Sequence, residues 1–572
     1  MRRLALVSLI ALGLAACQQQ AAPPAQTGTP APAASAASAS AAVTPPHAFA
    51  ADITAGDFAA HLERLSSDEF EGRKPGTIGE RLTTDYIVEQ FKRIGLQPGN
   101  HGDWFQSVPV VSTDLQNRDV TLDVAVGGGT EKFAYKTDMV VNTLQAQPDV
   151  KLDGSDIVFV GYGVDAPEYR WNDYAGVDVK GKTVIVLIND PGWDRNDPGL
   201  FKGRAMTYYG RWTYKYEEAA RKGAAACFIV HETEPAAYGW NVVENSWDGP
   251  QLDLPASEDP APRLPVAGWL THEAAQRLFA KAGLDFEKLK AAADQRGFKP
   301  VALNAKASIE LHSKIENTRS ANVLGLLKGS ERPDEVVVYS AHWDHLGKDP
   351  SLQGDQIFNG AIDNATGVAA MLEIAEAFAH QNPKPKRSVL FVGLTLEESG
   401  LLGSKYYVAH PAFPLNKTVA DINMDALPII GPEKDMEVVG YGQSELEDYL
   451  KAALAAEGRS MTPEASPEKG HYFRSDHFNF AKAGVPALDA SGGIDLVNGG
   501  EEAGRKAMAD YVEHRYHSPA DAFDPNWDYR GVIEDVQTLY AVGEKLAGES
   551  SFPQWRADSE FRAAREKSMQ QK

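Results

Sequence analysis

The chain is poor in cysteine and in positive charge. Its 572 residues include two cysteines, Cys17 and Cys227, which excludes a disulfide-stapled scaffold and any zinc site built from several thiolates. Lys and Arg number 56 against 79 Asp and Glu, a formal net charge of −23. Because so acidic a surface repels a phosphate backbone, nucleic acid is not an expected partner.

Familiar catalytic patterns are also missing. Residues His231–Glu234 depart from the H-E-x-x-H pattern of many zinc peptidases, and no G-x-S-x-G nucleophile turn occurs. Gly161-Tyr-Gly163 begins like a dinucleotide-binding loop but lacks the third glycine, so a turn is expected there. The chemistry therefore has to come from residues that are far apart along the chain.

The N-terminal residues predict export and lipid attachment. Arg2-Arg3 precedes the apolar run Leu4–Ala16. That run is shorter than the roughly 20 residues that a bilayer requires, so it is interpreted as part of a signal peptide. Leu14-Ala-Ala-Cys17 resembles the bacterial lipobox, in which the cysteine is lipidated and becomes the new N-terminus. Gln18 stands where an inner-membrane retention signal has Asp, which implies the outer membrane of the cell envelope, facing the periplasm. The alternative is ordinary cleavage nearby and a soluble periplasmic or secreted protein.

The residues after this signal change from a linker to folded sequence. Residues 17–48 are rich in Ala, Pro, Gln, Ser and Thr, a composition that predicts a flexible linker. Apolar spacing predicts helices near 58–65 and 82–94, the second ended by Gly95. Residues 118–165 are expected to be rich in strands.

A βαβ unit is expected next. It combines the apolar runs Val184–Ile188 and Ala224–Val230 with a helix at Tyr214–Lys222. Cys227 lies inside the second run and is expected to be a small core residue. Alanine-rich helices are expected from there to about residue 294.

From Ser320 onward, short apolar runs alternate with helical patterns such as Gly367–His380. This alternation predicts an α/β fold with a mostly parallel sheet and helices on both faces. The predicted strands are Glu335–Ser340, Ser388–Thr395, Thr418–Met424, Met436–Tyr441 and Val485–Ala490.

Acidic and imidazole side chains cluster where these predicted strands end, which is where sites form in open α/β sheets. Each residue alone is weak evidence, since Asp-Asn before a helix is usually an N-cap and a lone histidine is usually structural. Together, imidazoles and carboxylates form the donor set of a hydrolytic zinc site, and a divalent cation removes the repulsion between neighbouring carboxylates. The residues are His342 and Asp344 after the first strand, Glu397 and Glu398 after the second, Asp425 after the third, Asp363 before the helix, and His517 late in the chain.

These motifs resemble the M28 family of zinc exopeptidases, which includes bacterial aminopeptidases and glutamate carboxypeptidases. Phe70–Gly76 and the helix after it resemble the family's N-terminal segment, and Gly161–Gly163 with the βαβ unit resembles its inserted protease-associated (PA) domain. The resemblance implies a phosphorylase/hydrolase-like catalytic core with a β-rich PA-like insertion. The expected division is signal peptide 1–16, lipidated Cys17 with linker 17–48, N-terminal part of the peptidase domain 49–129, insertion 130–300, catalytic core 301–549 and C-terminal tail 550–572.

By that resemblance, five residues hold two zinc ions. Asp363 bridges the ions, His342 and Asp425 complete one of them, and Glu398 and His517 complete the other. The family pattern also implies a cis peptide bond after the bridging aspartate.

The same resemblance assigns roles around the metals. Glu397 is the general base, which takes a proton from the metal-bound water and passes it to the leaving amine. Asp344 is expected to accept the second N–H of His342 and to fix its tautomer. Tyr516 and Arg474 are candidates for contact with the oxyanion and the substrate, with packing and an exposed ion pair as the alternatives. His345 and His477 are expected to be structural, because all five ligand positions are filled.

The expected activity is that of a tethered di-zinc aminopeptidase acting on short peptides, since acidic residues beside the metals can bind a free α-amino group. A carboxypeptidase of the same family needs an arginine cluster for the terminal carboxylate, and only Arg474 is evident. Two further alternatives are a glutaminyl cyclase, which keeps one zinc, and a non-catalytic receptor, which lacks ligands. The intact set of five ligand positions argues against both.

The lipid anchor can be tested directly. Cys17→Ser removes the acceptor thiol, so we expect the variant to leave the membrane fraction when cells are lysed and centrifuged. The wild-type protein is the control, and we expect it to sediment with membranes in the same experiment. Sedimentation of the variant with membranes would contradict the anchor.

Overall fold

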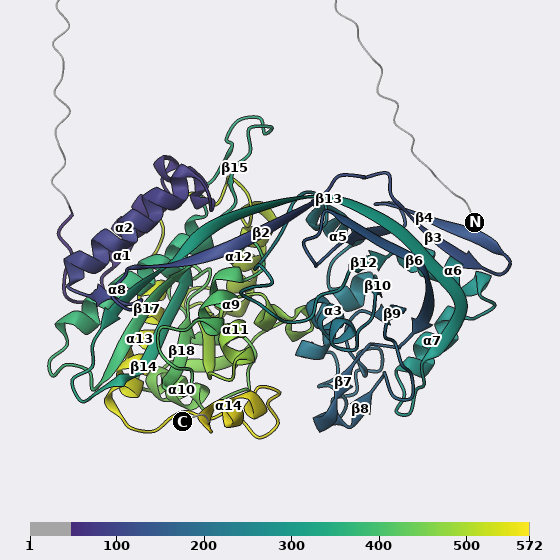
Figure 1. Ribbon diagram of the computed structural model, residues 1–572. Coiled ribbons are helices and arrows are strands. Elements are labelled where there is room, and N and C mark those ends of the chain that lie inside the picture. Colours follow the sequence, from purple (N-terminus) through teal and green to yellow (C-terminus); the bar gives the residue numbers. More distant parts are fainter. Residues whose placement is uncertain (1–46, 571–572) are drawn as a thin grey trace, which may run out of the picture. The chain divides into compact units, whose positions relative to one another are not determined.

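The computed structural model describes residues 47–570 (Figure 1). The expected signal peptide, Cys17 and nearly all of the expected linker lie outside the described residues. Within residues 47–570, no helix has both the length and the apolar composition needed to cross a bilayer.

The region expected to form the catalytic core is built around one mixed sheet. Its centre is parallel, with β17 (Arg387–Leu394), β14 (Arg332–His342), β18 (Thr418–Asn423) and β21 (Ala487–Gly492) side by side in that order. Next to β17 lie β13 (Val301–Leu327) and then β2 (Phe105–Leu115), and next to β21 lie β19 (Asp435–Val438) and then β20 (Ser460–Pro463). All five predicted strands of this region are confirmed.

Helices cover both faces of this sheet, as the sequence predicts (Figure 1). Val337 and Tyr339 of β14 pack into a core with one set of helices, and Val336 and Val338 pack against the other set. Because both faces are covered, β17 and β18 are buried along their whole length. The first set is α1 (Ala55–Leu65), α2 (Ile78–Ile94), α8 (Thr366–His380), α10 (Leu446–Glu457) and α13 (Arg530–Gly548), and the second is α9 (Leu402–Ala409) and α11 (His477–Lys482).

Local signals define the N-terminal helices. The hydroxyl of Thr54 accepts the backbone N–H of Asp57 at the start of α1, and that of Thr77 accepts the N–H of Gly79 at the start of α2. Gly95 adopts a left-handed conformation (φ 89°) directly after α2, so the predicted helix end is confirmed.

A second sheet is formed between β2 and β13 in the sequence. Its parallel strands are β6 (Asp149–Phe159), β9 (Thr183–Leu187), β10 (Ala226–Val230) and β12 (Val266–Leu270). Helix α3 (Trp212–Arg221) connects β9 to β10, which confirms the βαβ unit, and Cys227 is buried in this region's own core. Other elements here are β3 (Thr121–Val126), β4 (Gly129–Ala134), β5 (Met139–Asn142), β7 (Asp165–Ala166), β8 (Trp171–Asn172), α4 (Thr233–Ala236), α5 (Trp240–Ser246), α6 (His272–Lys281) and α7 (Phe286–Ala293). The short strand β11 (Gln251–Asp253) instead pairs with β2 of the first sheet.

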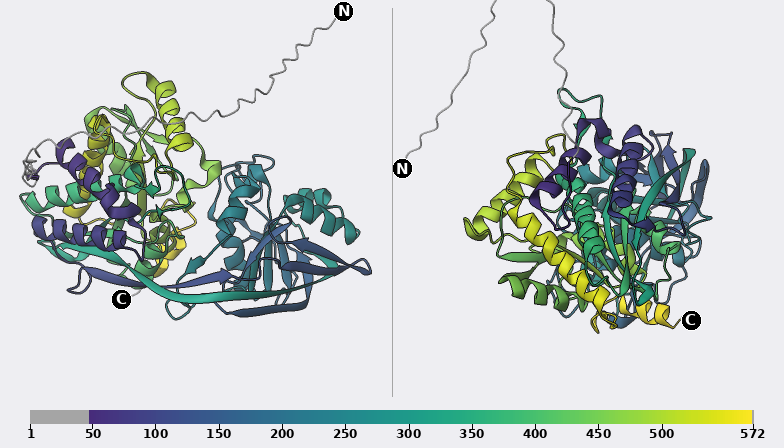
Figure 2. Two further views of the ribbon diagram at one scale, coloured as in Figure 1. Left: turned by 90° about the horizontal axis from the view of Figure 1, so that it is seen from above. Right: turned by 90° about the vertical axis from the view of Figure 1, so that its left-hand side faces the viewer.

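Strand β13 belongs to both sheets. Its first half, as far as His312, pairs with β6, and its second half, from Ser313, pairs with β2 and then β17. The left-hand view of Figure 2 shows this long teal strand running from one sheet to the other. The expected boundary at residue 130 falls inside the β3–β4 hairpin. Strand β3, which lies before that boundary, already belongs to the second sheet, where it pairs with β13.

The C-terminal residues, expected as a tail, pack against the first sheet. Trp555 and Phe561 are buried there, and the guanidinium of Arg565 donates to the carbonyl oxygens of Leu415 (2.8 Å) and Thr418 (2.9 Å). The remaining elements are β1 (Gln97–Pro98), β15 (Gly347–Lys348), β16 (Ile357–Phe358), α12 (Gly500–His514) and α14 (Arg562–Met569).

Candidate metal centre

The side chains singled out in the sequence meet at the carboxyl end of the parallel strands. His342 is the last residue of β14, Glu397 and Glu398 follow β17, and Asp425 follows β18. Asp363 lies in the short segment Ala361–Ala365 before α8. Since parallel strands end at the same edge of a sheet, these groups are brought together even though they are far apart in sequence.

Asp363 stands between two imidazoles. Its Oδ1 lies 3.3 Å from Nε2 of His342, and its Oδ2 lies 3.1 Å from Nε2 of His517. His342 Nε2 is also 3.0 Å from Oδ1 of Asp425, and His517 Nε2 is 3.3 Å from Oε2 of Glu398. All five predicted ligand residues therefore converge, in two groups that share Asp363.

A further histidine reaches the same place. Nδ1 of His345 lies 2.6 Å from Oε1 of Glu398, and its Nε2 is buried without a hydrogen-bond partner. His345, Asp363 and Glu398 have donor atoms close enough to hold a metal ion, as do His342, Asp363 and Asp425. The sequence analysis treated His345 as structural, whereas the structure makes it a second candidate beside His517 for the ion held by Glu398. His477 instead lies 3.0 Å from Asp489.

Charge is concentrated at this centre. Burial lowers the pKa of His342, but the carboxylates of Asp425 and Glu397 outweigh burial and raise that pKa well above its ordinary value. Burial raises the pKa of Asp363, but hydrogen bonds from His342 and His517 outweigh it, and the pKa falls well below the usual range. Imidazole nitrogens and carboxylate oxygens that are buried together fit a zinc ion, because a divalent cation balances the negative charge of the carboxylates.

Asp344 acts differently from the expectation. The ring Nδ1 of His342 lies 3.1 Å from the carbonyl oxygen of Asp344, and 3.9 Å from its carboxylate. The carbonyl oxygen therefore accepts the imidazole N–H, since 3.9 Å is too long for a hydrogen bond. The Asp344 carboxylate instead accepts the backbone N–H of Glu397 at 3.1 Å, which couples the end of β14 to the turn after β17.

The segment around Asp363 is held by a residue that is not among the predicted site residues. The carboxylate of Asp521 accepts the backbone N–H groups of Ile362 and Asp363, each at 3.1 Å. Asp521 lies four residues after His517, so one loop both supplies an imidazole and holds the Asp363 backbone. The peptide bond Asp363–Asn364 is cis, as the family resemblance implies.

The two candidate substrate residues lie at the edge of the centre. Tyr516 is 46% exposed, and its ring stacks on that of His517 with centroids 4.0 Å apart. Arg474 donates to the carbonyl oxygen of Lys469 at 2.8 Å, and forms no ion pair within residues 47–570. The next residue, Ser475, donates its hydroxyl to Oδ2 of Asp425 at 2.5 Å, whereas the Arg474 side chain is exposed.

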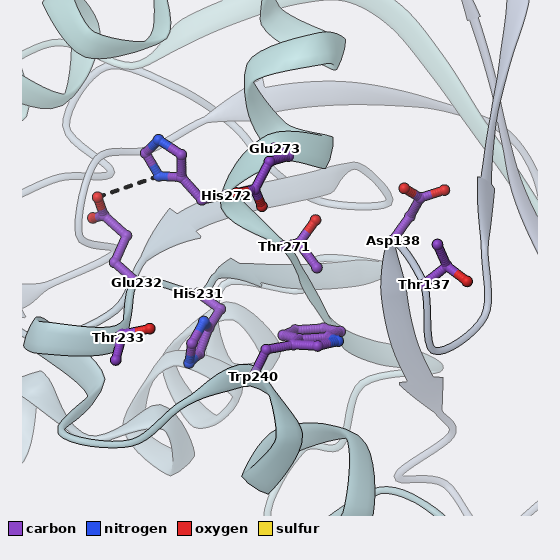
Figure 3. Close-up of a pocket in the computed structure, with 9 residues that line it drawn as sticks. All are labelled: Thr137, Asp138, His231, Glu232, Thr233, Trp240, Thr271, His272 and Glu273. Carbon is purple, nitrogen blue, oxygen red and sulfur yellow. Dashed lines mark ion pairs between the residues drawn. The ribbon is translucent and has the colours of Figure 1, made fainter. Parts of the chain in front are cut away.

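A cavity of about 580 Å³ lies elsewhere, at the carboxyl ends of β10 and β12 in the second sheet (Figure 3). Two of its three acidic groups already have ion-pair partners: Glu232 pairs with His272 (3.3 Å) and Lys290 (2.7 Å), and Asp138 pairs with Arg277 (2.8 Å). The residues that line it are Thr137, Asp138, His231, Glu232, Thr233, Trp240, Thr271, His272 and Glu273, none of them a predicted site residue.

A phosphate-binding sequence pattern occurs in the second-sheet region, but the structure around it is not that of a phosphate-binding loop. Gly176–Thr183 matches the phosphate-binding pattern G-x-x-x-x-G-K-[ST], but Thr183 begins strand β9. A phosphate-binding loop of this kind opens a helix. Since neither the cavity nor this pattern of the second-sheet region brings predicted site residues together, the cluster around Asp363 is the candidate site.

Comparisons with known proteins agree with this position. Residues 322–541, which contain all five predicted ligands and Glu397, match the family model described as Peptidase family M28. Aminopeptidase NAALADL1 of Mus musculus is 32% identical over 137 residues, 23% of this chain and 17% of that protein. Leucine aminopeptidase 2 of Arthroderma otae is 26% identical over 275 residues, 46% of this chain and 52% of that protein. The chain spans between 17% and 28% of the length of the first three curated relatives that it matches.

Solved structures with similar folds include an aminopeptidase from Aneurinibacillus sp. strain AM-1. It has 20% sequence identity and a TM-score of 0.48, with 87% of this chain and 95% of that chain covered. A zinc aminopeptidase from Bacillus subtilis has 17% identity and a TM-score of 0.40, with 90% of this chain and 98% of that chain covered.

Proposed function

We propose that this protein is a di-zinc aminopeptidase. The observation that carries the proposal is Asp363, whose two carboxylate oxygens face two different imidazoles at 3.3 Å and 3.1 Å. Asp363 would bridge the ions, with His342 and Asp425 on one side and Glu398 and His517 on the other. When bound, two zinc ions supply Lewis acidity for hydrolysis of a peptide bond.

Glu397 is positioned to move the proton. Its backbone N–H is held by Asp344, so its place beyond β17 is set by the end of β14. Burial raises its pKa well above the ordinary value, and the carboxylates of Asp425 and Glu398 add to that shift against the opposing charge of His342. A raised pKa makes the carboxylate form a stronger base, which is suited to take a proton from water and donate it to the leaving amine.

The acidic surroundings favour a substrate with a free amino group. Glu397 and Asp425 are both half-buried and not fully enclosed. An α-ammonium group placed there would be attracted by these charges and would donate hydrogen bonds to them. Cleavage after the first residue of a peptide is the reaction that this arrangement supports.

Recognition of the terminal carboxylate of a peptide is a second possibility, and the buried side chain of Arg211 supports it. Arg211, directly before α3 in the second-sheet region, is 9% exposed, and within residues 47–570 its guanidinium has no hydrogen bond or ion pair to an acceptor. Burial lowers its pKa to about 10, and the nearby charge of Arg474 adds to the shift. Burial and these cations, with Lys469, also lower the pKa of His471 to about 4.

Arg211 and Arg474 form a cationic pair, and Ser475, the residue after Arg474, contacts Asp425 of the acidic centre. A short peptide could therefore place its amino end at the carboxylates and its terminal carboxylate at the arginines. The second candidate function is thus a carboxypeptidase or dipeptidase that recognises the terminal carboxylate.

The metal count tests the centre. We expect elemental analysis to find two zinc ions per wild-type chain, and about one in His342→Ala and in His517→Ala, because each removes a ligand of one ion. His345→Ala is the matched control and should keep both ions. One zinc in the wild type would favour a cyclase. Loss of zinc from His345→Ala, with retention in His517→Ala, would make His345 the ligand.

The general base is tested by Glu397→Gln. The amide keeps the size of the side chain but cannot carry the proton, so kcat should fall by about 10²–10⁴-fold while zinc content stays unchanged. Hydrolysis of amino acid p-nitroanilides gives kcat, and elemental analysis gives the metal. The exposed Glu89→Gln serves as control. Turnover of Glu397→Gln near the wild-type rate would refute the assignment.

The terminal carboxylate is tested by Arg211→Gln. With a free dipeptide as substrate, KM should rise by about tenfold or more, since a charge-assisted hydrogen bond is lost. With the corresponding dipeptide amide, which has no carboxylate, KM should stay the same. Arg204→Gln, at an exposed position of the same loop, should affect neither substrate. Equal effects on both substrates would rule out carboxylate recognition and leave the aminopeptidase alone.

A further inference from the structure

A buried arginine lies beneath the candidate metal centre. Arg73 ends the 3₁₀ helix Asp68–Arg73, is 1% exposed, and has no carboxylate within ion-pair distance among residues 47–570. Within the described part of the chain, every hydrogen bond that its guanidinium donates goes to a backbone carbonyl oxygen. These bonds run from Nε to Trp343 (2.9 Å), from Nη1 to Leu65 (3.1 Å) and Asn359 (2.5 Å), and from Nη2 to Gly360 (2.8 Å) and Asp363 (3.4 Å).

These carbonyl groups belong to two segments that carry metal-facing side chains. Trp343 lies between His342 and Asp344 at the end of β14. Gly360 and Asp363 belong to the segment that places the shared carboxylate. Because the guanidinium is planar and its donors are fixed relative to one another, one side chain sets the spacing between the two segments.

The Asp363 segment is held from two sides. Arg73 donates hydrogen bonds to the carbonyl oxygens of Gly360 and Asp363. On the other side, the carboxylate of Asp521 accepts hydrogen bonds from the N–H groups of Ile362 and Asp363. A cation on the carbonyl side and an anion on the amide side match the polarity of the peptide groups. The backbone that carries the Asp363 carboxylate is therefore constrained before any metal binds.

The space around the guanidinium is filled. A Cβ atom added to Gly360 would lie 2.7 Å from Nη2 of Arg73 and 2.6 Å from Cδ2 of His345. Gly72, directly before the arginine, has φ 66°, and an added Cβ would collide with the carbonyl oxygens of Gly347 and Phe358. The chain thus approaches the centre closely here, which only glycine permits.

We propose that Arg73 is a positioning residue for the metal centre: it ties the His342 segment to the Asp363 segment, so that the ligands are arranged in advance of zinc binding. This inference rests on the proposed metal centre and adds a role for the N-terminal part of the fold. Arg73 acts through the backbone and touches neither substrate nor metal.

The test measures zinc affinity on the full chain by competition with a chelator. Arg73→Ala should bind zinc about 10–100-fold more weakly, the range found when groups that orient metal ligands are removed. Arg73→Lys should recover only part of the affinity, because a single ammonium cannot reach both segments. Free guanidinium ion at millimolar concentration should restore zinc affinity to Arg73→Ala and leave Arg73→Lys unchanged, since only the alanine variant has room for it.

Arg565→Ala is the matched control. Arg565 is 2% exposed and also donates to two backbone carbonyl groups, those of Leu415 and Thr418, which carry no metal-facing side chain. This variant should lose thermal stability but keep wild-type zinc affinity. If Arg73→Ala does not fold, the comparison of Arg73→Lys with Arg565→Lys decides in its place.

The outcomes separate the two proposals. Wild-type protein that binds no zinc would refute the metal centre itself. Wild-type protein that binds zinc, with Arg73 variants of equal affinity, would refute only the positioning role. The positioning role would also be refuted by an equal loss of zinc affinity in the Arg565 variant, or by no rescue with guanidinium.

Discussion

A single buried carboxylate, that of Asp363, determines how the centre is organised. Buried alone, it would be costly to ionise, so its charge has to be balanced by neighbours. His342 and His517 supply that balance, one to each oxygen. The same geometry brings together two groups of donor atoms that could hold a metal ion, and Asp363 belongs to both. The ligand arrangement thus follows from the need to satisfy one charge from both sides.

The surrounding structure holds that carboxylate in place with backbone contacts from three directions. Asp521 binds the N–H groups of the segment, Arg73 binds its carbonyl groups, and the Asn364 side chain donates to the carbonyl oxygen of Met424 at 3.0 Å. These contacts come from the N-terminal segment, the end of β18 and the loop after α12. A centre of this kind therefore depends on nearly the whole catalytic region being folded.

The second sheet contributes to the same site through shared structure. Strand β13 runs through both sheets, and the backbone N–H of Met206 donates to the carbonyl oxygen of Pro467 at 3.1 Å. Lys482 pairs with Glu217 at 2.7 Å, and Tyr208 packs against Phe478 with ring centroids 5.3 Å apart. These contacts bring the loop that ends in Arg211 up to the loop of Arg474. The proposed recognition of a terminal carboxylate by Arg211 therefore draws on both regions.

The sequence by itself determined the α/β fold, the strands of the first sheet and the βαβ unit, because short apolar runs and the helical spacing of apolar residues are local properties of the chain. It also located the acidic and imidazole residues at strand ends. It did not reveal that His345 reaches Glu398, that the carbonyl group of Asp344 rather than its carboxylate holds His342, or that Arg73 and Asp521 hold the Asp363 segment. Those facts were decided by tertiary structure alone, because each is a contact between groups far apart in sequence or a choice between two oxygens of one residue. Periodicity and residue type carry no information about such distances.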